Sequence, residues 1–209
     1  RDLVRSRGLG DVYKRQLYDK GCKIVAVSDY SGGVYNENGL DIPAIRTYLS
    51  DKTKALIDYV SDDVKHISND EVITCCCDVL IPAALENQIT GENAAGVQAK
   101  VIIEAANGPT TVEADKILEE KGIVVVPDIL ANAGGVVVSY FEWVQNIQSM
   151  AWDLDEVNRT LKKIMNKAYD EVDAMSRDNK VTMRMGAYMV AINRICTAGK
   201  MRGGPISMA

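Results

Sequence analysis

Cys22-Lys23-Ile24-Val25-Ala26-Val27-Ser28-Asp29 is the stretch that decides the fold. Its middle is a continuous apolar run, a glycine precedes it at Gly21, and a carboxylate ends it. Such a run is typical of a strand that is buried on both faces of a sheet. Sheets of this kind are parallel and are covered by helices, so the stretch predicts an α/β protein.

Three further short apolar runs are bounded by residues that favour turns. They are Asp78–Pro82, Lys100–Glu104 and Ile123–Pro127. Each has the length and composition of a buried strand, and helix signals lie between them. Alternating strands and helices imply a parallel sheet with right-handed crossover connections. The sequence therefore predicts a doubly wound sheet.

Residues that begin and end helices lie between and after these strands. Asp41 predicts a short helix through Tyr48, and Thr110 with Glu113 predicts a capping box, with Gly122 as the left-handed stop. Beyond the last strand the apolar spacing indicates helices only. These are expected at Asn132–Gln145, from Asp153 to Met175 and from Thr182 to Ala198.

Composition and charge exclude several classes of protein. Of the 209 residues, 25% are charged and 47% are apolar, as in an ordinary globular chain. The net charge is −5, and because Arg1–Gln16 holds five basic and two acidic residues, the remainder carries −8. An acidic body argues against nucleic acid as a partner, and no apolar run is long enough to suggest a membrane span.

The five cysteines favour a reducing compartment. Their number is odd, and Cys75, Cys76 and Cys77 are adjacent, which matches neither a disulfide framework nor metal-ligand spacing. We therefore expect small buried thiols and no metal site. The N-terminus also lacks the apolar core of a signal peptide, so we expect a cytoplasmic protein.

Residues Arg1–Gln16 differ from the rest of the chain in charge and in pattern. Gly8-Leu9-Gly10 supplies only part of a phosphate-binding G-x-G-x-x-G turn, and the neighbouring Asp11 would oppose a phosphate. Our hypothesis is that this segment is foreign sequence, joined at Leu17. An uninterrupted native reading frame that encodes the same segment would contradict it.

Asp29 is the first candidate for a binding role. An acid at the end of a strand in a doubly wound sheet can accept hydrogen bonds from both hydroxyls of an adenosine ribose. The alternative is a residue of the turn that follows the strand, or a helix cap. The residue type and position fit both.

Four blocks, in order and consistently spaced from Leu17 onward, resemble the amino-acid dehydrogenases that act on glutamate, leucine, phenylalanine and valine. The resemblance implies a Rossmann-like α/β domain with C-terminal helices. It divides the chain into the aberrant residues 1–16, a dinucleotide-binding domain at 17–150 and a helical segment of the same domain at 151–209. The blocks are Val25–Asp29 with Gly32–Asn36, Cys77–Thr90, Glu104–Thr111 and Pro127–Val136.

Within that family, Val138–Asn146 resembles the glutamate enzymes. The resemblance implies that the Ser139 hydroxyl helps to hold the side-chain carboxylate of the substrate, with Val136 beside it. A hydrogen-bond donor has no use in a pocket for leucine. The alternative is a helix serine that bonds back to a carbonyl of the preceding turn.

The resemblance also implies the cofactor site. Asp29 and Ser31 would hold the adenosine ribose, while Ala83 and Ala84 would line the cleft with backbone groups. Asn107 would approach the nicotinamide end. Asn132 would anchor the carboxamide, whose donors and acceptor match an amide. NAD is favoured over NADP, which stays possible, because Asp29 would repel a 2′-phosphate.

The implied reaction is the oxidative deamination of L-glutamate to 2-oxoglutarate and ammonia by a homo-oligomer, commonly a hexamer. The lysine and aspartate that carry this chemistry belong, in the family, to a separate N-terminal substrate domain, and its glycine-rich lysine motif is absent from these 209 residues. We therefore expect no catalytic residue here and an inactive fragment. The alternatives are a non-catalytic NAD-binding module and a fragment of a leucine or phenylalanine dehydrogenase.

Overall fold

The computed structural model describes residues 15–51 and 53–202. The chain divides into two compact units, the first ending at Ile123 and the second beginning at Val124, and each is described by itself. Most of the segment for which we predict a foreign origin, and its Gly8-Leu9-Gly10, lie outside the described residues. Residues 15–19 are helical, and Gly21 follows with φ +83°, the left-handed conformation expected of a helix stop.

The first unit opens with an antiparallel sheet of three strands, β1 (Ala26–Asp29), β2 (Gly32–Tyr35) and β3 (Lys65–Ile67), in that order. Val27 pairs with Val34 in the β1–β2 hairpin. The predicted strand is thus present but shorter. Its observed partner is antiparallel rather than parallel, because a tight turn after Asp29 returns the chain along the same strand.

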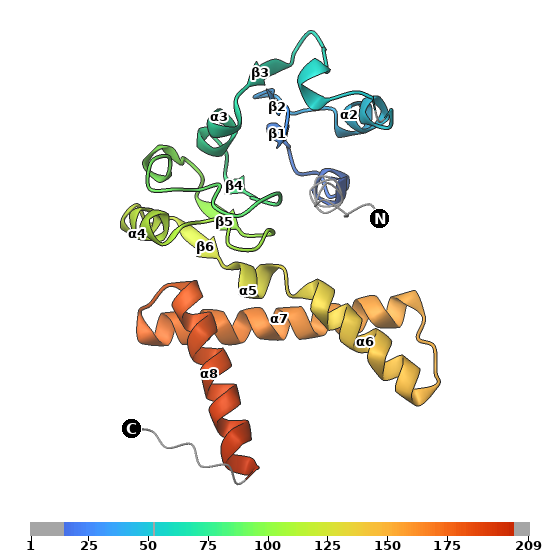
Figure 1. Ribbon diagram of the computed structural model, residues 1–209, viewed down its shortest axis with the longest axis vertical. Coiled ribbons are helices and arrows are strands. Elements are labelled where there is room, and N and C mark those ends of the chain that lie inside the picture. Colours follow the sequence, from blue (N-terminus) through green and yellow to red (C-terminus); the bar gives the residue numbers. More distant parts are fainter. Residues whose placement is uncertain (1–14, 52, 203–209) are drawn as a thin grey trace. The chain divides into compact units, whose positions relative to one another are not determined.

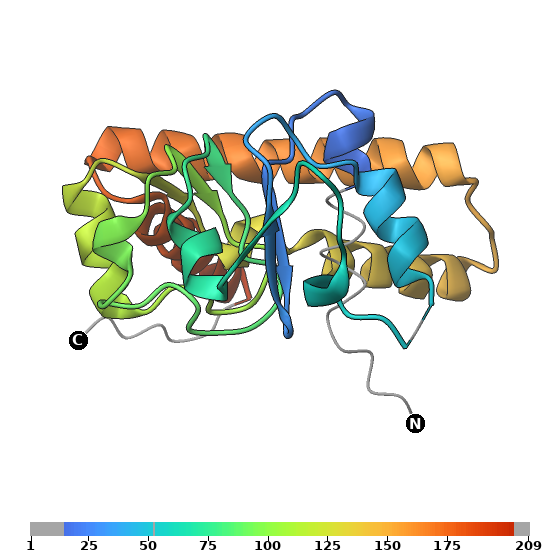
Figure 2. The ribbon, with the colours of Figure 1, turned by 90° about the horizontal axis from the view of Figure 1, so that it is seen from above.

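A small apolar core holds this hairpin to α2 (Ile42–Leu49) and to the 3-10 turn η1 (Leu56–Asp58). Asp41 accepts a hydrogen bond from the Ala44 amide, which confirms the predicted cap of α2. α2 lies beside the hairpin in both views (Figures 1 and 2). The buried members of the core are Val27, Val34, Leu40, Ile42, Ile45 and Leu56.

Helix α3 (Asn69–Thr74) leads from β3 to the parallel strands β4 (Val79–Leu80) and β5 (Val101–Ile103). Both strands were predicted from their apolar runs, and each is shorter than the run that marks it. The 3-10 turn η2 (Ala94–Gly96) lies between them in sequence, and α4 (Val112–Glu120) follows. The mixed α/β architecture with parallel strands confirms the predicted fold class.

The cap of α4 is one residue later than predicted. Thr111, not Thr110, accepts a hydrogen bond from the Ala114 amide. Thr110 instead forms a bridge with Ile89, and its Oγ1 is buried with no hydrogen-bond partner among the described residues. Thr110, which the sequence spacing assigns to the cap of α4, is therefore engaged in the pairing with Ile89 instead. Gly122 ends the helix region with φ +70°, as predicted.

The second unit begins with β6 (Val124–Val126) and continues as helices α5 (Asp128–Ala131), α6 (Gly134–Gln148), α7 (Leu154–Asn179) and α8 (Met183–Met201). Asp153 and Thr182, at which the sequence predicts these helices to begin, cap α7 and α8. α8 crosses α7 near the C-terminal end of α7 (Figure 1). Their shared core consists of Leu130, Val172, Met183, Ala187 and Val190.

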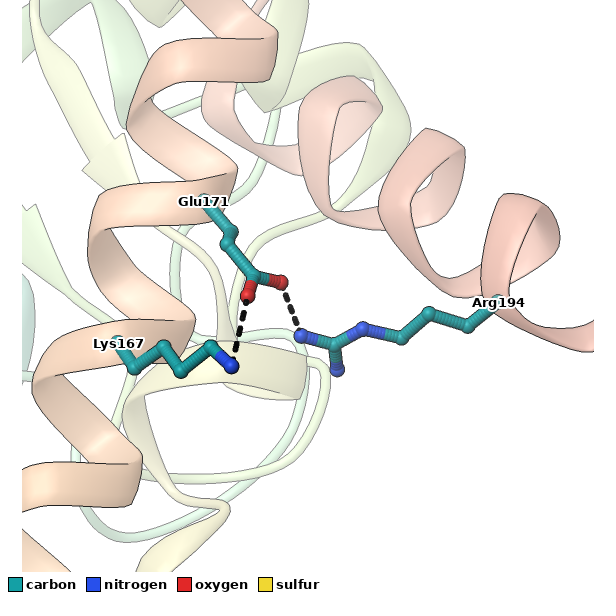
Figure 3. Close-up of polar contacts among 3 residues, drawn as sticks. All are labelled: Lys167, Glu171 and Arg194. Atoms are coloured by element: carbon teal, nitrogen blue, oxygen red, sulfur yellow. Dashed lines mark hydrogen bonds and ion pairs between the residues drawn. The ribbon is translucent and has the colours of Figure 1, made fainter.

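Ion pairs and backbone packing fix the α7–α8 crossing. Figure 3 shows Glu171 of α7 between Lys167, one turn earlier, and Arg194 of α8. At Gly186 a Cβ would lie 3.0 Å from the carbonyl oxygen of Val172. The helices can approach this closely because Gly186 has no side chain. Arg184 of α8 pairs with Asp128 of α5 at 3.7 Å.

The cysteines depart from prediction. All five are free thiols, but none is buried, and Cys22 and Cys76 are exposed. The triplet lies in the connection between α3 and β4. Among residues 15–51 and 53–202, no three His, Cys, Asp or Glu side chains are placed to hold a metal ion. No helix in the same ranges is long and apolar enough to cross a membrane.

Candidate cofactor and substrate site

Asp29 is held in one orientation at the end of β1. Its Oδ1 accepts hydrogen bonds from the Ser31 amide at 2.7 Å and from the Ser31 hydroxyl at 2.5 Å. The Ser31 oxygen in turn accepts a bond from the Ile57 amide at 3.2 Å, which ties the turn to η1. Both local bonds use the same carboxylate oxygen. Oδ2 is therefore the atom that can accept from a ligand.

The two interpretations of Asp29 are compatible in this geometry. The turn that we weighed as the alternative role is present, and it engages Oδ1. The bonds to Ser31 fix the position of the Asp29 carboxylate. Because Asp29 is only half-buried, the carboxylate still contacts solvent. A carboxylate oriented by its neighbours needs little further ordering to bind a diol. Sequence pattern reveals the acid and Ser31 but not the contribution of Ile57, which is distant in the chain.

The segments that follow β4 and β5 are joined by backbone hydrogen bonds. The Pro82 carbonyl accepts from the amides of Ala105 and Ala106 at 3.1 and 2.9 Å. Since β4 and β5 are parallel, their carboxyl ends meet at one edge, which is where open α/β sheets bind ligands. The predicted residues Ala83, Ala84 and Asn107 lie on these two segments.

Exposure at this edge suits contact with a ligand. Ala83 is half-buried, whereas Ala84 and Asn107 are exposed, and both of these make further interactions within the protein. Gly108 follows with φ +53°, a conformation that glycine adopts without strain. Its carbonyl accepts a hydrogen bond from the Asn87 amide at 2.9 Å, so the Asn107 loop is anchored.

Asn132 belongs to the second unit, where it ends α5 instead of beginning the next helix as predicted. Its amide donates to the Asp128 carbonyl at 3.0 Å, and its side chain is half-buried. Two residues later α6 begins at Gly134. A Cβ placed on Gly135 would meet no described atom within 4 Å, so a ligand has room to approach the backbone here.

Val136 and Ser139 lie three residues apart on α6, hence on one face, and both are exposed. The Ser139 hydroxyl donates to the Gly135 carbonyl at 3.0 Å. That bond is the one weighed as the alternative to a substrate role. Rotation of the hydroxyl group would let it donate its hydrogen bond to a ligand in place of the Gly135 carbonyl. The observed bond is therefore compatible with a binding role.

Parallel strands with linked carboxyl-terminal segments, in a mixed α/β architecture, define a Rossmann-like domain. The model of the Glutamate/Leucine/Phenylalanine/Valine dehydrogenase family matches residues 7–203. The chain therefore belongs to this family. The match includes ten residues of the segment 1–16.

Individual relatives agree with the family. The chain is 45% identical to the catabolic NAD-specific glutamate dehydrogenase of Bacillus subtilis over 196 residues, which are 93% of this chain and 45% of that protein. It is also 45% identical to an NAD-specific glutamate dehydrogenase of Staphylococcus aureus over 93% of the chain and 46% of the relative. The chain thus spans somewhat less than half the length of these curated relatives.

Solved structures show the same fold. Glutamate dehydrogenase from Peptoniphilus asaccharolyticus is 38% identical, with a TM-score of 0.76 over 93% of this chain and 45% of that one. The leucine-bound, hetero-hexameric glutamate dehydrogenase from Thermus thermophilus is 29% identical, with a TM-score of 0.84 over the same shares of the two chains.

Proposed function

We propose that this chain is the NAD-binding part of an enzyme that oxidatively deaminates L-glutamate to 2-oxoglutarate and ammonia. The proposal is supported by the family match and by relatives that are themselves NAD-specific glutamate dehydrogenases. Bound NAD supplies the acceptor for the hydride that leaves the substrate's α-carbon. Residues 17–150 form the dinucleotide-binding region, and residues 151–209 its helical extension.

The orientation of Asp29 carries the choice of cofactor. With Oδ1 engaged by Ser31, Oδ2 accepts hydrogen bonds from the ribose hydroxyls of the adenosine. The same carboxylate repels the additional phosphate of NADP, so the chain prefers NAD. Ser31 positions Asp29 through its amide and hydroxyl, and Ile57 holds Ser31 in place.

The remaining residues bind and orient. Ala83, Ala84 and Asn107 contact the cofactor from the linked segments after β4 and β5, and Asn132 holds the nicotinamide carboxamide. Val136 and Ser139 on α6 contact the substrate, with the Ser139 hydroxyl donating to its side-chain carboxylate. A carboxylate accepts a stronger hydrogen bond than the Gly135 carbonyl, which favours the rotation of that hydroxyl when substrate binds.

Proton transfer falls to groups outside these 209 residues. The family's lysine motif is not in this sequence, so residues 1–209 alone bind cofactor without turning over glutamate. We place the enzyme in the cytoplasm, a proposal that five free thiols support. We also propose a homo-oligomer, commonly a hexamer, supported by exposed apolar side chains on α6 and α8 such as Trp143 and Ile192.

A fluorescence titration of residues 1–209 with NADH and with NADPH tests the proposal. Energy transfer from Trp143 and Trp152 to the reduced nicotinamide provides the signal. Saturable NADH binding with weaker NADPH binding is expected. Equal binding of both would contradict the role of Asp29, and no binding by a sample shown to be folded by circular dichroism would contradict the cofactor site as a whole.

A further inference from the structure

Helix α5 depends on the rest of the second unit for its position. It has four residues, which is too few for a helix to be stable by itself. Leu130, which is 6% exposed, lies in the core that α7 and α8 share, together with Met183 at the start of α8. Asn132 follows directly and ends α5. The packing of α5 against α7 and α8 therefore decides where Asn132 lies.

Contacts within the second unit hold Asp128, the first residue of α5. Its carbonyl accepts a hydrogen bond from the Asn132 amide at 3.0 Å. Its Oδ1 accepts from the Ile129 amide at 2.7 Å and lies 3.7 Å from Nη1 of Arg184. The side chains of Asp128 and Arg184 are 24% and 21% exposed, so water and salt screen this pair less than a surface pair. Arg184 is thus connected to Asn132 through Asp128.

The position of Arg184 is unfavourable for α8 itself. Arg184 is the second residue of that helix, where the helix dipole favours negative charge. Arg177 shows the opposite case, because it lies in the last turn of α7 and pairs with Asp173 of the same helix at 2.7 Å. A cation at the start of α8 is therefore stabilised by partners outside that helix. Asp128 is one of them, and Arg184 makes further interactions within the protein.

We propose that Arg184 is a positioning residue for the nicotinamide end of the cofactor, and that it acts through Asp128 on Asn132. The inference rests on the proposed function, in which Asn132 holds the nicotinamide carboxamide. Hydrogen bonds between two amides depend on direction as well as distance, so a small shift of α5 weakens them while the fold persists. The adenosine end, which the proposed function assigns to Asp29, should not sense that shift.

Titration calorimetry of residues 1–209 with NADH and with ADP-ribose separates the two ends, because ADP-ribose lacks the nicotinamide. Arg184→Met keeps the apolar part of the side chain and removes the guanidinium. It is expected to weaken NADH binding ~5-fold, as for the loss of about one hydrogen bond, and to leave ADP-ribose affinity unchanged. Arg184→Lys keeps the charge but not the planar fork, and it should recover part of the lost NADH affinity.

Arg177→Met is the matched control, since it removes the shorter ion pair with Asp173 and should leave both affinities unchanged. Asp128→Asn repeats the test from the other partner. It keeps an oxygen that can accept from the Ile129 amide and removes the charge that Arg184 meets. It should reproduce the selective loss, and its combination with Arg184→Met should add little further. Circular dichroism establishes folding, and if Arg184→Met is unfolded, Asp128→Asn and Arg184→Lys decide the question.

Amide hydrogen exchange gives a second readout that needs no cofactor. The amides of Ala131 and Asn132 donate to carbonyls at the start of α5, at 2.8 and 3.0 Å. Their exchange should be severalfold faster in Arg184→Met than in Arg177→Met, because α5 opens more often when its contact with α8 is lost. Exchange that is equal in the two variants would overturn the inference.

The affinities separate this inference from the proposed function. Equal losses of NADH and ADP-ribose affinity in Arg184→Met would make Arg184 a structural residue only, and unchanged NADH affinity would leave it no role at this site. Either result overturns the inference while the proposed function stands. Absence of NADH binding by the folded, unaltered chain would contradict the proposed function, and the inference with it.

Discussion

At the scale of single residues, one local motif occurs twice with different surroundings. Asp29 Oδ1 accepts from the amide and hydroxyl of Ser31, and Asp51 Oδ1 accepts from the amide and hydroxyl of Thr53 at 3.0 and 2.7 Å. Of the two acids, only Asp29 ends a strand. Local bonding therefore does not distinguish a binding acid from a turn residue, and the proposed role of Asp29 depends on its position at the end of β1.

Asp29→Asn is expected to weaken NADH binding about tenfold, since hydrogen bonds to a charged group contribute about 1.5–3 kcal/mol. The asparagine oxygen can still accept from Ser31, so the turn persists. Loss of the negative charge should also bring NADPH affinity closer to that of NADH. Fluorescence titration of both cofactors measures the two effects.

Asp51→Asn is the control for this change, because it alters the same motif in the loop after α2. Its NADH affinity should equal that of the unaltered chain. If Asp29→Asn and Asp51→Asn behave alike, Asp29 is a turn residue and the first of our two interpretations is wrong.

At the scale of elements, the α7–α8 crossing depends on a missing side chain. An alanine at position 186 would place its Cβ 3.0 Å from the Val172 oxygen and 3.1 Å from the Ser176 nitrogen. Both are backbone atoms of α7 and cannot rotate away. Gly186→Ala is therefore expected to destabilise the second unit by ~1–2 kcal/mol despite the better helix propensity of alanine. Chemical denaturation followed by circular dichroism measures the change.

Gly135→Ala provides the opposite case on α6. It is exposed and has open space around its Cβ position, so alanine should stabilise the chain by up to ~1 kcal/mol, measured without cofactor. Equal effects of the two substitutions, in either direction, would show that propensity rather than close packing decides at Gly186.

The ion pairs at the same crossing contribute less. Arg194→Ala removes the contact with Glu171, whose side chain is 37% exposed, and is expected to cost about 0.5 kcal/mol. Addition of salt should reduce that cost because the pair is partly in solvent. A double-mutant cycle with Glu171→Gln isolates the interaction, and a coupling energy of zero would contradict it.

At the scale of the whole molecule, apolar surface remains uncovered. Tyr188, Ile192 and Ile195 lie along α8 at spacings of four and three and are all exposed, at 49%, 57% and 71%. Exposed patches of this kind mark association surfaces. Sedimentation of residues 1–209 should show concentration-dependent self-association. Ile192→Glu should reduce it severalfold, whereas Thr197→Glu, a polar exposed position of the same helix, should not.

Helices and strands were largely predictable because their signals are local. Asp41, Asp153 and Thr182 cap the helices expected of them, and the apolar runs mark β1, β4, β5 and β6. The strands β2 and β3 were not predicted. Gly32 and Gly33 have little strand propensity, and β3 is a polar edge strand whose place depends on pairing with β2.

The candidate site was predictable only in its residue types. Resemblance to the family identifies Asp29 and Asn132, but nothing in the local sequence connects Ile57 to Ser31 or Pro82 to Ala105. These bonds join residues distant in the chain, and they form only when the strands and loops pack.

The sequence by itself determined the class of fold, most of the helix caps and the family, because apolar periodicity, capping chemistry and consistently spaced blocks are properties of short segments. Tertiary structure alone decided the antiparallel partner of β1, the shift of the α4 cap from Thr110 to Thr111 and the close approach at Gly186. Each of these outcomes is a competition between a local preference and a contact with a distant residue. The distant contact prevails where it satisfies backbone hydrogen bonds or closes a core.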